Sequence, residues 1–471
     1  MVMDHNSYYQ AILTHDTRFD GVFFVGVSTT KIYCRTVCTA KTPRSENCKF
    51  FSTAALAEQS GFRPCLLCRP ELAPGNARID AVSRLAASAI NRIEDGSLTE
   101  KRLDEFAAEM GITDRHLRRV IQSEFGVSPI ELIQTQRLLL AKRLLTDTNL
   151  PITEIAFASG FASLRRFNAL FKERYRLNPT DLRKRRATAA NETLVCELAY
   201  RPPLDWQSLL DYLKVRALAG IESVAGNRYL RTVEIDKQTG WIAVEVAAEK
   251  PVLRVEVSAS LAKTLLPVLA GVKRVFDLKT EPLQIAAQLG ELAAANPGLR
   301  VAGAFNGFEI AVRAILGQQI SVKSATTLAG RYVAAFGEAI ETPIAGLTHL
   351  TPKPDRVAAA EPGELTSLGI IAARARSIQA LAQAVADGKL KLEPGVNVEQ
   401  TIQQLKELPG IGEWTAQYIA MRALSWPDAF PHTDLGVYKA LETNKPKRVL
   451  EIAEAWRPWR AYAVMHLWKK L

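Results

Sequence analysis

The sequence predicts a multidomain protein that is mainly α-helical and has smaller α/β parts. Three observations support this fold class. The chain has 471 residues, and at roughly 100–200 residues per domain this corresponds to about three domains. Hydrophobic residues make up 48% and charged residues 23%, which excludes a mainly disordered or collagen-like chain. Amphipathic helical patterns with glycine and proline breaks dominate, whereas strand-like alternation is confined to one stretch.

The patterns divide the chain into four predicted domains. The first holds five of the six cysteines and is expected to be a small α/β module. The second is helical, the third contains the alternating segments YLRTVEI, GWIAVEVAA and LRVEVSA, and the fourth is all-helical. Residues 187–193 have the composition of a linker. The predicted domains span residues 1–76, 77–187, 194–275 and 276–471.

Charge and cysteine usage indicate the partner and the compartment. The 60 lysines and arginines exceed the 49 acidic residues, giving +11 and a pI near 9.3, which favours a polyanionic partner such as nucleic acid. No run of 18 apolar residues and no signal-peptide core are present, so we expect a cytoplasmic protein without a membrane contact. Six cysteines are too few for a disulfide framework, so clustered ones indicate a metal or reactivity.

The first domain contains a candidate zinc site. Three residues separate Cys34 from Cys38, two separate Cys65 from Cys68, and 26 residues separate the two pairs. Two close pairs joined by a loop suit a tetrahedral Zn²⁺ site, which would also supply folding energy to a small domain. The alternative is four buried free cysteines. Two other cysteines lack such neighbours and are expected to be bystanders: Cys48 and Cys196.

Three strings in this domain resemble the N-terminal domain of the Ada alkylation-response family: TKIYCRTVC (30–38), RSEN (44–47) and GFRPCLLCRP (61–70). The resemblance implies that Cys34 accepts a methyl group from a DNA phosphotriester, with the other three thiolates as companions. It also implies phosphate contacts from Lys41 and Arg63. A purely structural role for Cys34 is the alternative. The Pro-Cys-His-Arg motif of Ada methyltransferases is absent, so removal of methyl from guanine O6 is not expected.

The chemistry implied for Cys34 is physically reasonable. The thiolate is the reactive form of cysteine, and zinc keeps it deprotonated at neutral pH. Four thiolates on one zinc ion leave net negative charge, which favours attack on a methyl carbon. Methylation would then reduce repulsion from DNA phosphates.

The second domain contains an internal repeat. LDEFAAEMG (103–111) and ITEIAFASG (152–160) each end in a glycine that suits a tight turn, and each is followed by a basic helix. The glycine-to-proline separations, Gly111 to Pro129 and Gly160 to Pro179, are 18 and 19 residues. This pattern looks like the AraC-type double helix-turn-helix, with recognition helices near 114–124 and 163–173. A bundle with solvated basic faces is the alternative. The candidate DNA-contacting residues are Arg115, His116, Arg118, Arg119, Arg165, Arg166 and Asn168.

The fourth domain contains a predicted helix-hairpin-helix. LPGIG (408–412) lies between an amphipathic helix near 399–407 and a helix beginning at Glu413. Gly410 and Gly412 permit a turn whose backbone N–H groups point at a DNA phosphate. An ordinary interhelical turn is the alternative.

The region from Leu194 onward resembles the AlkA family of alkylated-base DNA glycosylases over about 275 residues. The matching strings are PPLDW, RAILGQ, ISV, LPGIGEWTA, WRPWRAY and HLW. By this resemblance Asp434 is catalytic, Asp428 is a weaker candidate, and His432 belongs to the local loop. Where the family places an apolar wedge, this chain has Gln319 with Ile320 beside it. Where some relatives carry tyrosine after the catalytic acid, this chain has Leu435.

The expected chemistry follows from the glycosidic bond. Its hydrolysis passes through an oxocarbenium-like state that a carboxylate stabilises, and a cationic base leaves readily. Trp414 and Tyr418 share a helix face at spacing i, i+4, and Trp468 matches a pocket tryptophan of the family. These rings would bind an extruded base by stacking and cation–π contact, although they could also be core residues. Strand-cleaving relatives have lysine at the position of Trp414, so water is the expected nucleophile.

These features predict a monofunctional glycosylase for 3-methyladenine and 7-methylguanine, fused to a methylphosphotriester sensor and transcription regulator. The alternative is a regulator whose glycosylase region only binds DNA. The expected cofactor is Zn²⁺ in the first domain, with none for the glycosylase reaction. The expected partners are double-stranded DNA, alkylated DNA and RNA polymerase, and the expected state is a monomer.

Overall fold

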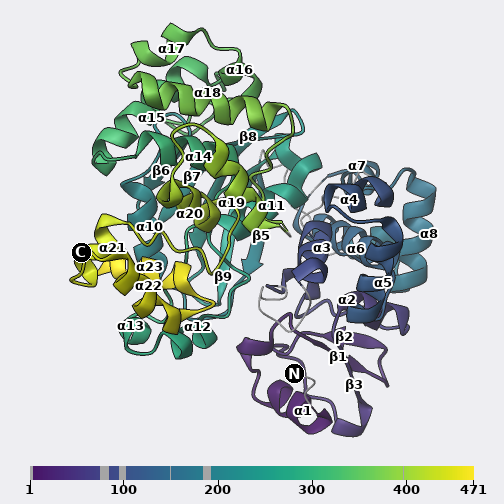
Figure 1. Ribbon diagram of the computed structural model, residues 1–471. Helices are drawn as coiled ribbons and strands as arrows, with labels where there is room; N and C mark the ends of the chain where they lie inside the picture. The colour runs from purple at the N-terminus through teal and green to yellow at the C-terminus, as the bar shows by residue number, and fades with distance from the viewer. Residues whose placement is uncertain (1–3, 75–83, 95–101, 149, 184–192, 396) are drawn as a thin grey trace. The chain divides into compact units, whose positions relative to one another are not determined.

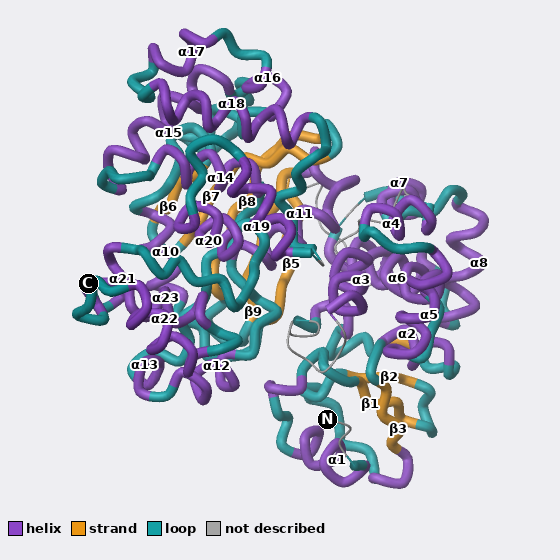
Figure 2. Tube along the Cα trace, viewed as in Figure 1, coloured by secondary structure: helices purple, strands orange, loops and turns teal. Residues whose placement is uncertain are grey.

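The computed structural model describes residues 4–74, 84–94, 102–148, 150–183, 193–395 and 397–471 (Figures 1 and 2). The predicted boundary at residues 76 and 77, and residues 187–192 of the predicted linker, lie outside these ranges. Contacts divide the chain into two compact units. One consists of residues 1–202, 247–270 and 278–280, and the other of 203–246, 271–277 and 281–471.

Among the described residues, no helix combines the length and apolar character needed to cross a bilayer.

The cysteine-rich domain is a four-stranded sheet in the order β3-β1-β2-β4, with two helices. β1 pairs antiparallel with β2 and β3, whereas β2 and β4 are parallel, with Tyr33 opposite Pro64. This parallel register brings Cys34 next to Cys65, because each follows a paired position. The elements are α1 (His5–Leu13), β1 (Phe24–Val27), β2 (Ile32–Cys34), β3 (Cys48–Phe51), α2 (Ala54–Gln59) and β4 (Arg63–Pro64).

Seven helices fill the described part of residues 84–183, as the double helix-turn-helix predicts. Gly111 and Gly160 both adopt positive φ, +73° and +80°, which glycine permits without strain. Thr113 and Ser163 cap the two recognition helices, so the second begins one residue later than predicted. The helices are α3 (Arg84–Glu94), α4 (Leu103–Glu109), α5 (Asp114–Phe125), α6 (Pro129–Asp147), α7 (Ile152–Ala158), α8 (Leu164–Tyr175) and α9 (Pro179–Arg183).

The alternating segments form strands, as predicted. In the first unit, β5 (Thr193–Ala199) pairs antiparallel with β9 (Val252–Ser258). In the second unit, β7 (Arg228–Ile235) lies between β6 (Glu222–Ala225) and β8 (Gln238–Val246) in an antiparallel meander.

Helices make up the rest of the second unit and position its candidate site. The buried helix α14 packs against α18 and α20, and α19 pairs with α20 across the hairpin. Helix α21 packs against α23. The helices that follow the cysteine-rich and helix-turn-helix domains are α10 (Trp206–Lys214), α11 (Leu265–Val275), α12 (Pro282–Leu289), α13 (Glu291–Ala294), α14 (Gly307–Leu316), α15 (Val322–Phe336), α16 (Pro354–Ala358), α17 (Pro362–Ser367), α18 (Ala372–Ala386), α19 (Val398–Glu407), α20 (Glu413–Arg422), α21 (Leu435–Ala440), α22 (Pro446–Ala453) and α23 (Arg460–Lys469).

Candidate functional site

The four predicted zinc ligands converge. The Sγ atoms of Cys34, Cys38, Cys65 and Cys68 all lie within 4.8 Å of one another. A tetrahedral ion with Zn–S bonds of about 2.3 Å needs sulfurs about 3.8 Å apart, so this set fits zinc with little adjustment. Cys48 is buried in the sheet and lies outside the cluster.

Backbone N–H groups point at three of the four sulfurs. The amide of Arg35 donates to Cys68 Sγ and that of Leu67 to Cys65 Sγ, each at 3.4 Å. The amide of Ala40 donates to Cys38, whose pKa is lowered to about 7, chiefly by its hydrogen bond with Cys34. Among the described residues, the Cys34 thiol receives no such amide bond.

A buried ion pair lies beside the cysteine cluster. The Arg35 guanidinium pairs with the Asp20 carboxylate, with Nε 2.8 Å from Oδ1. The same guanidinium donates to the Cys68 carbonyl oxygen at 3.1 Å. Because both side chains of the pair are buried, they fix the loop that carries Cys34 and Cys38.

Most residues predicted to contact DNA lie on accessible surface. On α5, Leu117, Ile121 and Phe125 are buried, which leaves the basic residues of that helix on the opposite face. Arg118 pairs with Asp114 at 3.0 Å on this exposed face. Arg63 is half-buried, and His116 is intermediate. The exposed members of the predicted set are Lys41, Arg115, Arg118, Arg119, Arg165, Arg166 and Asn168.

The predicted hairpin connects α19 to α20 at the expected residues. Gly410 has φ +75°, a conformation that glycine adopts without strain, and a Cβ there would lie 2.2 Å from Ser377 Oγ. Gly412 is the N-cap residue of α20, and the space around it is open. Within the described chain, no backbone carbonyl accepts from the amides of Gly410 and Gly412. These amides are therefore available to an anion at the helix N-terminus.

The segment before α15, residues 317–321, is hydrogen-bonded to this hairpin. Gln318 Nε2 donates to the Gly410 carbonyl oxygen and to Thr415 Oγ1, both at 2.9 Å. Gln319 is exposed and has φ +54°, an uncommon backbone conformation for a residue other than glycine. Ile320 is partly buried beside it. The structure therefore places both predicted wedge positions next to the hairpin.

Asp434 is the N-cap of α21, and both oxygens of its carboxylate accept hydrogen bonds. Oδ2 accepts from Trp414 Nε1 at 2.8 Å, and Oδ1 accepts from Trp468 Nε1 at 2.8 Å. Oδ1 also accepts from the Val437 amide at 3.0 Å. Two indoles from helices distant in sequence thus converge on one half-buried carboxylate.

Aromatic rings line the space beside this carboxylate. Trp414 and Tyr418 stack with centroids 5.4 Å apart and planes 15° apart, which confirms that they share a helix face. Tyr418 and Trp468 lie 6.2 Å apart. Tyr212, on α10, is nearly parallel to Trp468 at 6.5 Å. The rings are only partly buried, so part of each is accessible to solvent.

Sequence reasoning missed two residues that contact this aromatic cluster, Tyr212 and Arg422. Arg422 follows Tyr418 by four residues on α20, so its helical spacing was a usable signal. Tyr212 is about 200 residues from Tyr418 in sequence. The only sequence feature that could have pointed to it is its position shortly after the PPLDW string.

Asp428, the weaker acid candidate, is buried and bonded to two arginines. It is 8% exposed, and Arg460 donates to Oδ1 at 2.7 Å and to Oδ2 at 2.9 Å. Arg457 also pairs with it. His432 lies in the loop after Phe430, whose carbonyl accepts from its amide. Leu435 is 73% exposed directly after Asp434.

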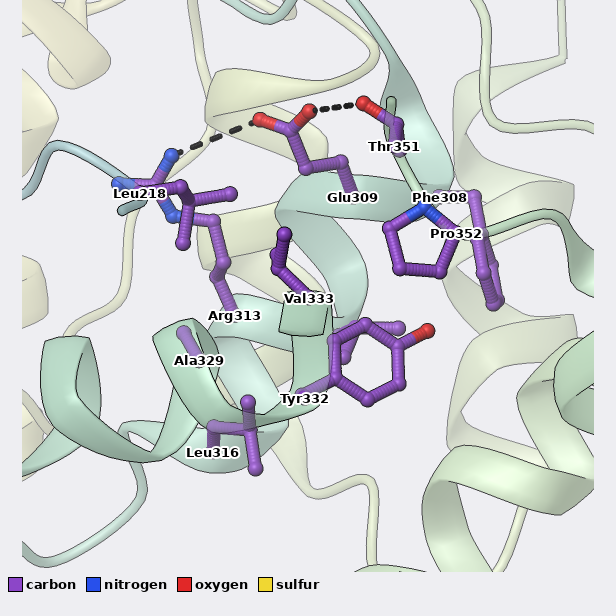
Figure 3. A pocket seen from close by; sticks show the side chains of 11 residues that line it. Leu218, Phe308, Glu309, Arg313, Leu316, Ala329, Tyr332, Val333, Thr351 and Pro352 are labelled. Atoms are coloured by element: carbon purple, nitrogen blue, oxygen red, sulfur yellow. Dashed lines mark hydrogen bonds and ion pairs between the residues drawn. The ribbon is translucent and has the colours of Figure 1, made fainter. Parts of the chain in front are cut away.

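A separate cavity lies between α14 and α15 (Figure 3). Among the residues that line the cavity, Glu309 accepts a hydrogen bond from Thr351 Oγ1 at 2.8 Å and forms an ion pair with Arg313. Its surroundings are otherwise mostly apolar, and none of the predicted site residues lines it. This cavity is therefore distinct from the aromatic cluster at Asp434.

Four family models match the chain in succession. They are the metal binding domain of Ada (residues 7–71), a helix-turn-helix domain (106–185), the AlkA N-terminal domain (195–306) and the HhH-GPD superfamily of base excision DNA repair proteins (312–457). Together with the cysteine cluster and the hairpin, they define a helix-hairpin-helix DNA glycosylase fused to an Ada-type zinc module and a helix-turn-helix regulator.

Curated relatives match the chain over all or part of its length. The chain is 37% identical over 99% of its length to a protein of Mycobacterium tuberculosis, covering 97% of it, described as a probable bifunctional transcriptional activator/DNA repair enzyme AlkA. It is 36% identical to DNA-3-methyladenine glycosylase 2 of Escherichia coli, over 58% of this chain and 95% of that protein. The chain therefore belongs to the family of bifunctional AlkA transcriptional activator/DNA repair enzymes.

A solved structure supports the fold of the second half. The 3-methyladenine DNA-glycosylase of Archaeoglobus fulgidus superposes with a TM-score of 0.51 at 22% identity, covering 58% of this chain and 97% of that one.

Proposed function

We propose that this protein is a monofunctional DNA glycosylase that excises alkylated purines of the 3-methyladenine and 7-methylguanine type. The observation that carries the proposal is the carboxylate of Asp434, fixed by two indole N–H groups beside a cluster of aromatic rings. The E. coli relative is named for 3-methyladenine, which agrees with this assignment.

The geometry supports a simple mechanism. As the glycosidic bond breaks, positive charge develops on the deoxyribose, and the ionised Asp434 carboxylate stabilises it. Because both oxygens are already oriented by Trp414 and Trp468, little reorganisation is needed at the transition state. Water attacks the anomeric carbon, since the position of the Schiff-base lysine in strand-cleaving enzymes is Trp414 here.

The base reaches this pocket only when it leaves the duplex. The free amides of Gly410 and Gly412 would bind a backbone phosphate next to the lesion. Gln319 and Ile320, tied to the hairpin through Gln318, are the candidates to fill the gap in the stack. The rings of Trp414, Tyr418 and Trp468 would then stack on a cationic base, worth about 0.5–2 kcal/mol per cation–π contact.

We further propose that the zinc module senses methylphosphotriesters. The Cys34 sulfur would attack the methyl carbon, an S–C bond would form, and the C–O bond would break with its electron pair returning to the phosphate oxygen. Bound zinc would keep the thiolates ionised. Among the four sulfurs, Cys34 lacks an amide donor within the described residues, and this supports its role as nucleophile because N–H bonds to sulfur reduce its basicity. Lys41 and Arg63 would contact phosphates.

The helix-turn-helix pair would read an operator through the exposed residues of α5 and α8. The remaining features of the proposal are a cytoplasmic location, a monomeric state, contact with RNA polymerase and no cofactor for base excision.

The test is release of 3-methyladenine from methylated DNA by the full chain. Release with first-order kinetics and an intact abasic strand supports a monofunctional glycosylase. Tight DNA binding without release would favour the alternative, a regulator whose glycosylase region only binds DNA.

A further inference from the structure

The loops that carry the cysteine cluster are joined by buried side chains to other elements of the first unit. Two series of contacts begin beside the cluster, one at Arg35 and one at Arg69, and both end in residues 197–201 at the C-terminal end of β5. All of these residues belong to the same compact unit. Charged groups are costly to bury unless they are paired, so these contacts hold the elements together tightly.

The first series of contacts passes through Asp20. The Arg35 guanidinium bonds both oxygens of the Asp20 carboxylate and donates to the Cys68 carbonyl oxygen. The backbone carbonyl of Asp20 accepts from Arg201 Nη2 at 2.9 Å. Arg201 is 1% exposed, and its Nη1 donates to the Lys279 carbonyl oxygen at 2.8 Å. Asp20 therefore connects a loop of the cysteine cluster to the segment just after β5.

The second series of contacts passes through the end of α6. Arg69 directly follows Cys68, and its guanidinium donates to Asp147 Oδ2 at 2.8 Å. The same Oδ2 atom lies 3.8 Å from Nε of Arg143, one turn earlier on α6. Arg143 in turn donates to the Glu197 carbonyl oxygen of β5. Because β5 is an edge strand, donors from another element can bond its backbone.

A buried ion pair fixes the cysteine-bearing loop to α6. Lys142 Nζ lies 2.5 Å from Glu71 Oε2, and the two side chains are 1% and 2% exposed. The other oxygen of Glu71 accepts from Arg69 Nε at 3.0 Å. Breaking a buried pair leaves an uncompensated charge, which is strongly destabilising. The loop and the helix are therefore expected to move together.

Both series of contacts depend on the cysteine cluster being held in place. Arg35 directly follows Cys34, and Arg69 directly follows Cys68. A bound zinc ion would cross-link the two loops that carry these cysteines, and metal binding at such a site contributes folding free energy. Without that cross-link, the backbone positions from which Arg35 and Arg69 reach their partners are no longer fixed.

We propose that zinc binding at the cysteine cluster orders the C-terminal end of β5, with Arg201 and Arg143 as the residues that connect the two. The match to the AlkA N-terminal domain begins at residue 195, so this coupling joins the metal-binding module to the glycosylase region. Coupling of this kind is reciprocal, so an ordered β5 raises the affinity for zinc by the same factor. The proposal requires neither base excision nor methyl transfer, and its failure would leave the proposed function standing.

The experiment measures hydrogen exchange by mass spectrometry in the full chain, first loaded with Zn²⁺ and then after removal of the ion with a chelator. Peptides that cover β5 report on the coupling, and peptides that cover β7, in the second unit, are the internal reference. We expect zinc removal to speed exchange in β5 about 10-fold relative to β7. Because the ratio is internal to each sample, general unfolding does not mimic this result.

Arg201→Met removes the guanidinium and keeps an apolar stem. In this variant β5 should exchange rapidly even with zinc bound, and zinc removal should change the β5-to-β7 ratio by about 3-fold or less. Its affinity for Zn²⁺, measured in competition with a chromophoric chelator, should fall about 10-fold. Arg201→Lys is the second variant if the methionine variant does not fold, because it keeps the charge but lacks the fork that bonds two carbonyl groups.

Arg300→Met is the matched control. Arg300 is 0% exposed and also donates to two backbone carbonyl groups, those of Asp277 and Pro203, but all three residues belong to the second unit. Its replacement should leave both the affinity for Zn²⁺ and the zinc dependence of exchange in β5 as in the wild type.

The other outcomes overturn defined statements. Exchange in β5 that is the same with and without zinc refutes the coupling, and so does an equal acceleration in β5 and β7. Wild-type zinc affinity and a wild-type zinc response in Arg201→Met remove Arg201 from the connection. A full chain that binds no Zn²⁺ contradicts the zinc site itself.

Discussion

Replacing Asp434 by asparagine removes the charge on which the proposed reaction depends while keeping the size of the side chain. At an effective dielectric of about 20, a carboxylate roughly 4 Å from a developing positive charge contributes about 4 kcal/mol. That corresponds to about a 10³-fold loss in the single-turnover rate of base release. The assay is release of 7-methylguanine from a defined duplex under enzyme excess.

The structure also gives the stability cost of this change. Asparagine retains an oxygen for the Val437 amide, so the cap of α21 survives. Its NH₂ group, however, must face one of the two indole N–H groups, leaving two donors opposed at a cost of about 1–3 kcal/mol. At roughly 2–4 °C per kcal/mol, the melting temperature should fall by about 2–12 °C, which leaves a folded protein at assay temperature.

The control is Asp355→Asn, at an exposed aspartate in the first turn of α16. This variant should change neither the rate of base release nor the melting temperature. A folded Asp434→Asn protein that releases base within about 3-fold of the wild-type rate would refute the reasoning.

Three further predictions concern other parts of the chain. Cys34→Ser should abolish the +14 mass shift, about one methyl group, that follows incubation with methylated DNA; Cys48→Ser should keep the shift, and a shift that persists in Cys34→Ser would disprove the assignment. Gly410→Ala places a Cβ 2.2 Å from Ser377 Oγ at φ +75°, so we expect at least about 10-fold weaker binding to an abasic duplex by fluorescence anisotropy; unaltered affinity would exclude the hairpin from DNA binding. Burial raises the pKa of Glu58 to about 7 from 4.5, so the folded state binds this proton more tightly and stability should fall as pH rises through about 7. In thermal melts at about pH 6 and about pH 8, the melting temperature of Glu58→Gln should change less with pH than that of the wild type. An equal change in both proteins would contradict the role given to Glu58.

Local pattern predicted the elements well where the pattern itself reflects burial. The alternation in YLRTVEI became β7, and the glycine turns at Gly111 and Gly160 took the positive φ that the repeat required. The pairing of Trp414 with Tyr418 followed from helical spacing alone. These features depend on residues within a turn or two of one another.

Contacts between distant segments were less accessible to sequence reasoning. Nothing local shows that Tyr212 meets Trp468, since the packing of α10 and α23 brings them together. Likewise, Asp428 and Asp434 are both acids in one loop, and only the structure shows that Asp428 is paired with Arg457 and Arg460. The indole bonds that orient Asp434 come from two different helices.

The most direct test is a crystal structure of the full chain bound to a duplex that contains a pyrrolidine abasic mimic, whose ring nitrogen carries the charge of the transition state. We expect an Asp434 carboxylate oxygen about 3 Å from that nitrogen, with the pocket of Trp414, Tyr418 and Trp468 open to the extruded base position. A mimic bound with a different carboxylate at this distance, and Asp434 still turned toward its two indoles well away from the ring, would contradict the account.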